Sequence, residues 1–344
     1  MKGGETMIFL KNDYSLGAHP VVMDALNKTN LELTDGYGED KYCRAAADII
    51  RMLFACPDAD VHFLTGGTQT NQTALAAFLL RPHWSVISAD TGHICVHETG
   101  AIEATGHKIN HVKTPDGKLT PALIEEVLIF HEDEHYVLPK AIYISNSTET
   151  GLIYTKAELQ ALRECCDKHG LYMYLDGARM AMALTCEDND LTFEDFPKLC
   201  DAFYIGGTKC GALFGEALVI INDELKPDMR FLIKQRGGLL AKGRLLGVQF
   251  GALLADDLYL QLGAHANRLA KKLADGIAAK GYEFCIPPQT NLIFPMIPKE
   301  LEAKLREKVM YETWPVVTET HQAIRLVTSW GSTEEEVDEF LKLI

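Results

Sequence analysis

Lys209 stands in a run of small and apolar residues that extends from Tyr204 to Ile220. A buried ammonium is costly, because removal from water disfavours the charged form. Two interpretations follow. Either the run is a surface loop whose lysine faces water, or it is part of a site where a desolvated amine with a lowered pKa acts as a nucleophile. The run alone does not choose between them.

A second segment has the composition of a phosphate-binding turn. A candidate strand over residues 60–64 is followed by Gly66, Gly67 and Thr68, and then by a stretch with helical character. The free amides and the dipole at a helix N-terminus bind anions. The segment matches neither the Walker pattern nor GxGxxG, so a tight turn with a threonine cap is the alternative.

A third segment places a carboxylate at the end of a predicted strand. Asp176 follows the apolar residues 171–175, and Arg179 comes three residues later. In open α/β sheets, ligands bind in the crevice beyond the carboxyl ends of the strands. A buried aspartate there needs a partner. That partner is either a protonated pyridine nitrogen of a ligand or Arg179 in an internal ion pair.

Together the three segments predict a pyridoxal phosphate site. A phosphate turn comes first, then a carboxylate that keeps the ring nitrogen protonated, then a lysine for the Schiff base. In this interpretation the residues around Lys209 are small because the cofactor must approach the amine closely.

The elements that must position these groups alternate between short apolar runs and helical patterns. Helices are expected over 69–80 and 155–170. Seven strands are expected, over 60–64, 85–89, 108–112, 141–145, 171–175, 202–206 and 217–221. Such alternation predicts an α/β domain with a mostly parallel sheet.

The pattern changes to α+β from about residue 250. A helix is expected near 250–280, strands near 291–297 and 323–329, and a last helix that begins at a capping box of Thr333 and Glu336. The chain has 344 residues, which suggests about two domains at roughly 150 residues each. We expect a large cofactor-binding domain with an N-terminal arm over 1–250, and a smaller C-terminal domain over 251–344.

Composition narrows the classes of function. Lys and Arg total 33 against 48 Asp and Glu, which gives a net charge of −15. Such an acidic chain is not expected to bind nucleic acid or anionic membranes. Nine cysteines without paired spacing favour a reducing compartment, so we expect a cytoplasmic protein. No signal peptide, membrane span or metal-ligand spacing is evident, so neither a membrane location nor a metal is expected.

Five segments, in order along the chain, resemble the L-threonine aldolases, which are pyridoxal phosphate enzymes of fold type I (PLP-dependent transferase-like). The segments are 34–46 (TDGYGEDKYCRAA), 91–101 (TGHICVHETGA), 175–179 (LDGAR), 206–220 (GGTKCGALFGEALVI) and 324–330 (IRLVTSW). The resemblance implies retro-aldol cleavage of L-threonine, L-allo-threonine or both to glycine and acetaldehyde. It also implies a homodimer or homotetramer with shared active sites.

The resemblance implies a role for each cofactor-binding residue. Lys209 would form the Schiff base with the cofactor, and Asp176 would pair with the pyridine nitrogen. Gly67 and Thr68 would hold the phosphate. His93 would stack on the ring, the alternative being a structural histidine with satisfied hydrogen bonds in a loop.

The resemblance also implies residues that bind the substrate. Two arginines, Arg179 and Arg325, would bind the substrate carboxylate, and Ser15 would be a third contact. Arg179 would also border the cofactor. Tyr37 would reach the active site of a neighbouring subunit. His135 would be an active-site histidine, the alternative being a solvated helix end among acidic residues.

Three points stay open at this level. Arg236 or Lys242 would reach the phosphate of a partner subunit, or lie in a solvated basic loop. The proton acceptor for the substrate hydroxyl could be His93, His135 or a water. Departures from the family pattern around Ser15, and Met182 in place of the usual asparagine, bear on substrate preference.

The alternatives to an aldolase are a β-eliminating lyase or an aminotransferase of the same fold, or a non-catalytic regulator that binds the cofactor.

Overall fold

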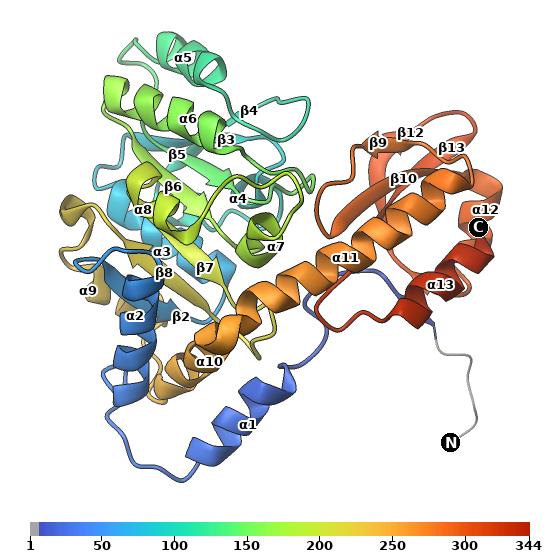
Figure 1. Cartoon of the computed structure of the whole chain (residues 1–344). Helices are drawn as coiled ribbons and strands as arrows, with labels where there is room; N and C mark the ends of the chain where they lie inside the picture. The colour runs from blue at the N-terminus through green and yellow to red at the C-terminus, as the bar shows by residue number, and fades with distance from the viewer. Residues whose placement is uncertain (1–6) are drawn as a thin grey trace.

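The computed structural model describes residues 7–344. The large domain is built on a seven-stranded sheet in the order β2-β8-β7-β6-β5-β3-β4 (Figure 1). Its strands are β2 (Asp60–Leu64), β3 (Trp84–Ala89), β4 (Lys108–Val112), β5 (Leu138–Ser145), β6 (Tyr172–Asp176), β7 (Ala202–Gly206) and β8 (Glu216–Ile220). All seven predicted strands are confirmed. The sheet is parallel except for β8, which runs antiparallel to both β2 and β7.

Both faces of this sheet are covered, so successive side chains of a strand enter different cores. Phe203 and Ile205 of β7 pack in one core with α2 (Lys41–Leu53) and α6 (Lys156–His169). Tyr204 packs in the other core with α3 (Gly67–Phe78). Every residue of β7 and β8 is buried, as is typical of strands covered on both faces.

The predicted helices are also present. The helix expected over 155–170 is α6, which begins with a capping box of Thr155 and Glu158 and ends at Gly170 in the left-handed region. The helix expected over 69–80 is α3. The remaining helices of the large domain are α4 (His93–Val96), α5 (Pro121–Phe130), α7 (Met180–Leu184), α8 (Phe196–Leu199) and α9 (Met229–Gln235).

A small antiparallel sheet forms the second domain, in the order β12-β13-β10-β9. Its elements are β9 (Phe284–Ile286), β10 (Leu292–Pro298), α12 (Lys299–Leu305), β12 (Glu312–Val317), β13 (His321–Val327) and α13 (Glu334–Leu343). α13 begins with the predicted capping box of Thr333 and Glu336. Leu269, Ile324 and Phe340 are among the fully buried residues of the small domain's core.

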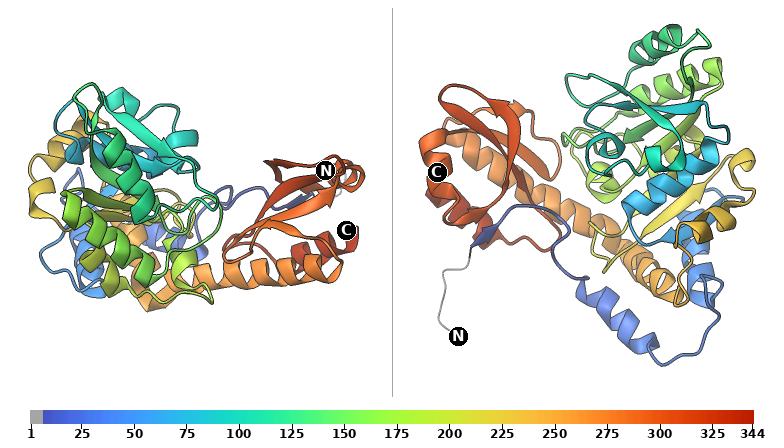
Figure 2. Two further views of the ribbon diagram at one scale, coloured as in Figure 1. Left: turned by 90° about the horizontal axis from the view of Figure 1, so that it is seen from above. Right: turned by 180° about the vertical axis from the view of Figure 1, so that it is seen from behind.

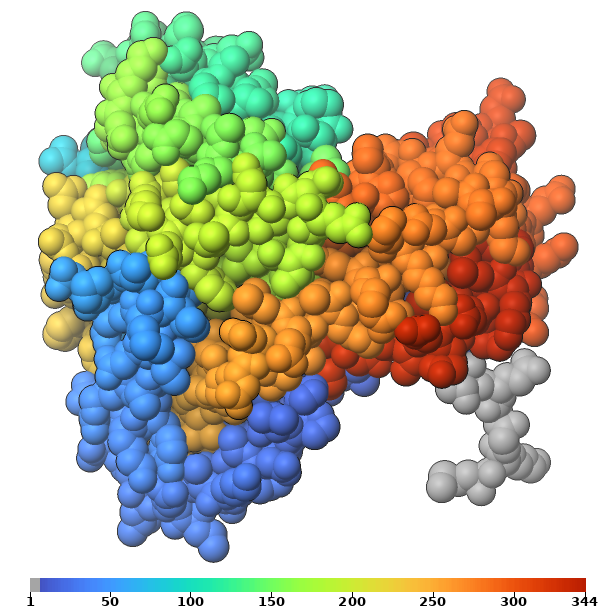
Figure 3. Space-filling view, viewed as in Figure 1, coloured from blue at the N-terminus to red at the C-terminus, as the bar shows by residue number. Residues whose placement is uncertain are grey.

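The long helix α11 (Leu258–Ala279) joins the two domains (Figure 1). Its contacts include α7 of the large domain and α13 of the small one. The views in Figure 2 show the small domain extending from the large domain along this helix, and Figure 3 shows residues of α11 lying against the large domain. Among residues 7–344, no helix is both long enough and apolar enough to cross a membrane.

The N-terminal arm contacts both domains. β1 (Ile8–Phe9) pairs in parallel with β11 (Val309–Met310) of the small domain. The chain then passes to α1 (Pro20–Thr29), which packs on α10 (Arg244–Leu254) at the periphery of the large domain (Figure 1). The boundary expected at 250/251 lies inside α10, and the division into domains at that point stays a prediction.

Candidate active site

The candidate site lies where β6 and β7 end next to the turn that follows β2. These strands approach so closely that a Cβ on Gly177 would lie 2.0 Å from the carbonyl oxygen of Tyr204. A pocket of about 200 Å³ opens there. Four of the predicted site residues line it together, namely Gly67, Thr68, His93 and Lys209. Residues up to 142 positions apart in sequence, Gly67 and Lys209, therefore meet at one pocket.

Asp176 lies beside this pocket, buried in a network of hydrogen-bond donors. Its Oδ2 accepts from the Tyr143 hydroxyl at 2.6 Å and from Asn71 Nδ2 at 3.1 Å, and its Oδ1 accepts from the Ala178 amide at 3.0 Å. Burial raises the pKa of this carboxyl, but the charge of His93 and the hydrogen bonds from Tyr143 and Tyr204 outweigh it, so the pKa lies below the ordinary value. The carboxylate therefore stays ionised, as a partner of a protonated ring nitrogen must.

Arg179 does not form the internal ion pair with Asp176 that the sequence left open. Its Nε and Nη2 instead donate to the two carboxylate oxygens of Asp13, at 2.7 and 3.1 Å. Asn291 Nδ2 also donates to Asp13, at 3.0 Å. The arm, the large domain and the small domain thus meet at one buried aspartate. Burial raises the pKa of Asp13, but the Arg179 charge outweighs this and holds it below the ordinary value.

Arg325 on β13 differs from Arg179 because no acidic side chain pairs with it among residues 7–344. Its Nε is buried and has no hydrogen-bond partner in this part of the chain. Burial lowers the pKa of its guanidinium, and the nearby charge of Arg179 lowers it further. A half-buried cation of this kind favours the binding of an anion.

His93 begins the short helix α4 and is held by a buried acid. Its Nδ1 lies 2.7 Å from Glu98 Oε1, which also accepts from Asn71 Nδ2 at 2.7 Å. Burial lowers the pKa of His93, but Glu98 outweighs it and the net shift is upward. The ring of His97 lies 5.4 Å from that of His93 between centroids. Burial shifts the pKa of His97 downward, so His97 favours the neutral imidazole more than His93 does.

Six of the ten predicted site residues do not line this pocket. They are Asp176, Arg179 and Arg325, described above, and three exposed residues, His135, Ser15 and Tyr37. The side chain of His135 is 82% exposed, and its Nδ1 lies 2.5 Å from Asp133 Oδ1, as in the alternative of a solvated helix end. Ser15 is exposed and donates to Asn12 Oδ1 at 2.9 Å. Tyr37 is also exposed, and the Lys234 ammonium lies 4.7 Å from the centroid of its ring.

Arg236 and Lys242, the two candidates for contact with the phosphate of a partner subunit, differ in their exposure. Arg236 is half-buried, and its carbonyl oxygen accepts from Gln69 at the start of α3. Lys242 is exposed. Neither lines the pocket that holds Lys209.

Sequence reasoning missed four buried polar residues of the site, which are Asp13, Asn71, Glu98 and Glu216. Glu216 is the first residue of β8, and its Oε2 accepts from the Gly207 amide at 2.8 Å. Burial raises the pKa of this carboxyl to about 7. A signal for Glu216 was present, because it lies in the same apolar run as Lys209 and its burial is costly for the same reason.

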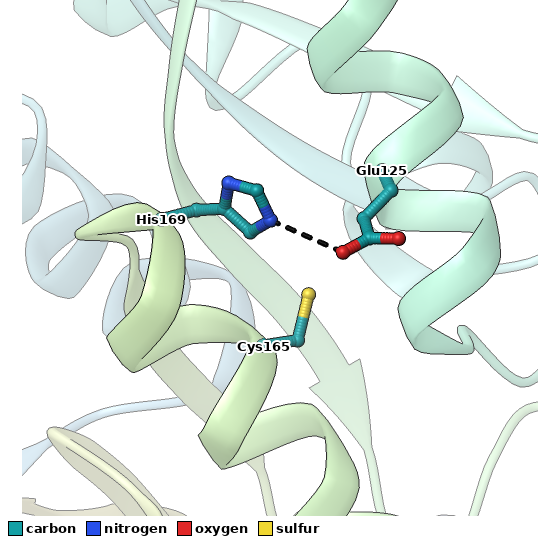
Figure 4. Close-up of side chains that lie close together, drawn as sticks. All are labelled: Glu125, Cys165 and His169. Atoms are coloured by element: carbon teal, nitrogen blue, oxygen red, sulfur yellow. Dashed lines mark hydrogen bonds and ion pairs between the residues drawn. The ribbon is translucent and has the colours of Figure 1, made fainter.

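One group of three metal-ligand types lies on the far edge of the large domain, between α5 and α6 (Figure 4). Ligand atoms of Glu125, Cys165 and His169 lie within 4.8 Å of one another. Glu125 Oε1 already accepts from Lys168 Nζ at 2.6 Å and lies 3.3 Å from His169 Nε2. A cation at this point would compete with the ammonium of Lys168. The cluster is explained as an ion pair, and the expected absence of a metal stays a prediction.

Comparisons with known proteins show the family to which the chain belongs. A family model described as beta-eliminating lyase matches residues 18–300. The chain is 33% identical to the low specificity L-threonine aldolase of Pseudomonas aeruginosa, over 98% of this chain and 96% of that protein. It is 34% identical to a protein of the same description from a Pseudomonas species, over 96% and 95% of the two chains.

Solved structures give the same result. The Leishmania major threonine aldolase shares 48% sequence identity with a TM-score of 0.96, and the match covers 97% of this chain and 98% of that one. A Thermus thermophilus aspartate aminotransferase, at 16% identity and a TM-score of 0.73 over 99% and 91% of the chains, shows that the fold is of type I. The chain belongs to the L-threonine aldolase family, within the beta-eliminating lyases.

Proposed function

We propose that this protein uses pyridoxal phosphate to cleave L-threonine, L-allo-threonine or both to glycine and acetaldehyde. One observation carries the proposal. Lys209 and Thr68 line the same pocket, and the ionised carboxylate of Asp176 lies beside it. The printed names of the two Pseudomonas relatives and of the Leishmania structure support the reaction.

The residues present fit the cofactor. α3 has 12 residues and begins at Gly67, so its free amides and the Thr68 hydroxyl suit a phosphate. Asp176 would hold the ring nitrogen protonated, and Lys209 would hold the cofactor covalently. When bound, pyridoxal phosphate supplies an electron sink for the bond that breaks.

The substrate carboxylate is assigned mainly to Arg325. Arg179 already gives two of its nitrogens to Asp13, whereas Arg325 has no acidic partner in the described chain. Its planar fork can bind a carboxylate through two hydrogen bonds. Arg179, held by Asp13, would border the cofactor.

We also propose where the proton acceptor for the substrate hydroxyl lies. His135 lies at the surface of its own subunit, so we take His93 and His97 as the candidate imidazoles within one chain. The hydrogen bond to Glu98 raises the pKa of His93, whereas burial lowers the pKa of His97, so His97 is the better candidate for a neutral ring that accepts a proton. A water held by these rings remains a further acceptor.

The protein is further proposed to act in the cytoplasm as a homo-oligomer with shared active sites. Large apolar side chains of the arm and of the loop between α1 and α2 are exposed, among them Leu31 at 92% and Leu33 at 101%. A second copy of this chain would cover them and place Tyr37 at the neighbouring site. The mass of the holoenzyme by light scattering tests this, and a monomer at micromolar concentration would contradict it.

The experiment that tests the reaction is the aldehyde yield from the four stereoisomers of threonine. We expect acetaldehyde and glycine in equal amounts from one or both L isomers, and none from the D isomers. Ammonia with a keto acid would instead assign the protein to β-eliminating lyases or aminotransferases. If the protein bound the cofactor but turned over none of the isomers, the result would favour the alternative of a non-catalytic regulator.

Arg325→Lys is expected to lower kcat/KM for L-threonine by on the order of tenfold to a hundredfold, because lysine keeps the charge but loses the fork. The figure corresponds to a charged hydrogen bond worth about 1.5–3 kcal/mol. Steady-state aldehyde release measures it, and the absorbance of the bound cofactor should stay unchanged. Arg306→Lys, on the surface, is the matched control. An unchanged kcat/KM would remove Arg325 from the substrate site.

A further inference from the structure

Glu216 lies between the two turns that form the pocket. In the sheet it pairs with Leu64 of β2 on one side and with Gly206 of β7 on the other. Leu64 leads directly into the turn of Gly67 and Thr68, and Gly206 leads into Lys209. The Glu216 side chain lines the same pocket as these residues. Its carboxyl therefore faces the place where a phosphate held by the first turn would lie.

The carboxyl of Glu216 has hydrogen-bond donors but no ion pair within 4.0 Å in the described chain. Its Oε2 accepts from the Gly207 amide at 2.8 Å. The Thr208 hydroxyl and the charge of Lys209 also lower its pKa, and the charge of Asp176 raises it. The other titratable groups whose ionisation Glu216 opposes are Tyr174, Tyr204, Cys210 and Tyr259. Burial outweighs the hydrogen bonds from Gly207 and Thr208 and the charge of Lys209, and raises the pKa of Glu216 to about 7.

We propose that Glu216 is a proton-holding residue of the cofactor pocket, neutral while a phosphate ester is bound there and ionised when the pocket is empty at alkaline pH. The proposal rests on the proposed function, because it takes pyridoxal phosphate as the cofactor. A carboxylate next to a phosphate dianion in a buried pocket is strongly unfavourable. A neutral carboxyl can instead donate a hydrogen bond to a phosphate oxygen.

The coupling fixes the direction of the pH dependence. Below pH 7 Glu216 of the empty enzyme is already protonated, so binding of the phosphate needs no proton. Above pH 7 the carboxylate must first take up a proton, so affinity falls as pH rises, by at most about tenfold per pH unit. By reciprocity, binding of the phosphate raises the affinity of Glu216 for its proton.

The test measures the affinity of the enzyme freed of cofactor for pyridoxamine 5′-phosphate. This probe has no aldehyde and forms no bond to Lys209. Between pH 6.5 and 8.5, the Kd of the wild type should rise by a factor about 25 times larger than that of Glu216→Gln, which is neutral at every pH, because the pKa of Glu216 in the empty pocket is about 7. Glu307→Gln, an exposed glutamate, should follow the wild type. Pyridoxamine without phosphate should show no difference between the wild type and Glu216→Gln.

A second measurement uses the wild type alone, so its result does not depend on whether Glu216→Gln folds. Calorimetry of the wild type at pH 7.5, in two buffers of different ionisation enthalpy, should show more proton uptake with pyridoxamine 5′-phosphate than with pyridoxamine, beyond the uptake that the titration of the probe's own groups accounts for. Equal pH dependence in wild type and Glu216→Gln, or no excess uptake, would overturn the proposal. Failure of the wild type to bind the probe at any pH would instead overturn the proposed function.

Discussion

Lys209→Ala is expected to abolish aldehyde release from L-threonine, with a loss on the order of 10³-fold or more, and to abolish covalent attachment of the cofactor. The reason is chemical. Lys209 supplies the amine at the pocket, and an alanine has no group to hold the cofactor or to exchange with the substrate's amino group. The small residues around it leave room for alanine, so the fold should remain intact.

The measurement pairs turnover with borohydride reduction followed by mass spectrometry of the peptides. Reduced cofactor should be found on the peptide of Lys209 in the wild type and on no lysine in Lys209→Ala. Lys198→Ala, an exposed lysine of the same domain, should behave as the wild type. Cofactor reduced onto another lysine together with normal turnover would show that Lys209 is not the attachment site.

The central sheet could be predicted from the sequence because its strands carry local signals. β7 is a continuous apolar run, β8 is one after its first residue, Glu216, and α6 has both a capping box and a terminal glycine, so composition alone indicates these elements. The antiparallel direction of β8 could not be predicted, since it depends on how the short connection after β7 turns the chain back. That connection also places Lys209 and Glu216 at the same end of the sheet.

The small domain was predicted less completely. β12 is an edge strand with mostly exposed residues and a proline, Pro315, in its middle, which argues against a strand when the sequence is considered alone. β1 and β11 have two residues each and are strands only because the two ends of the chain pair. Short local windows contain no information about such pairing.

Some residues of the candidate site could likewise be predicted from local sequence, whereas others are brought there only by the fold. Lys209, Asp176 and the glycine turn follow strands, so strand order alone predicts that they meet. Asp13 pairs with Arg179 across 166 residues, and only the folded arm shows that Arg179 is already bound to an acid. Glu216 could have been found, because the cost of burying a charge applies to it as it does to Lys209.

Asp176→Asn is expected to keep the fold but to lower kcat by on the order of 10²–10⁴-fold. Asparagine is neutral and cannot hold the ring nitrogen of the cofactor in its protonated form, and an unprotonated ring is a poor electron sink. The amide also brings an N–H group into a site where Tyr143 and Asn71 both donate. A modest loss of stability, about 1–3 kcal/mol for an unsatisfied buried donor, is therefore expected as well.

The pH dependence separates the electrostatic role of Asp176 from a structural one. The pKa of Asp176 lies below its ordinary value, so its contribution to stability is present above pH 4 and is lost only as pH falls through the lower, folded-state pKa. The wild-type kcat should thus show no titration of this carboxyl between pH 5 and 9. Tyr143→Phe removes one donor and keeps the charge, so its kcat should fall far less than that of Asp176→Asn. If Asp176→Asn instead retained near wild-type kcat with the cofactor bound, the carboxylate would serve only to hold Asn71 and Tyr143 in place, because the pair with Arg179 is not formed.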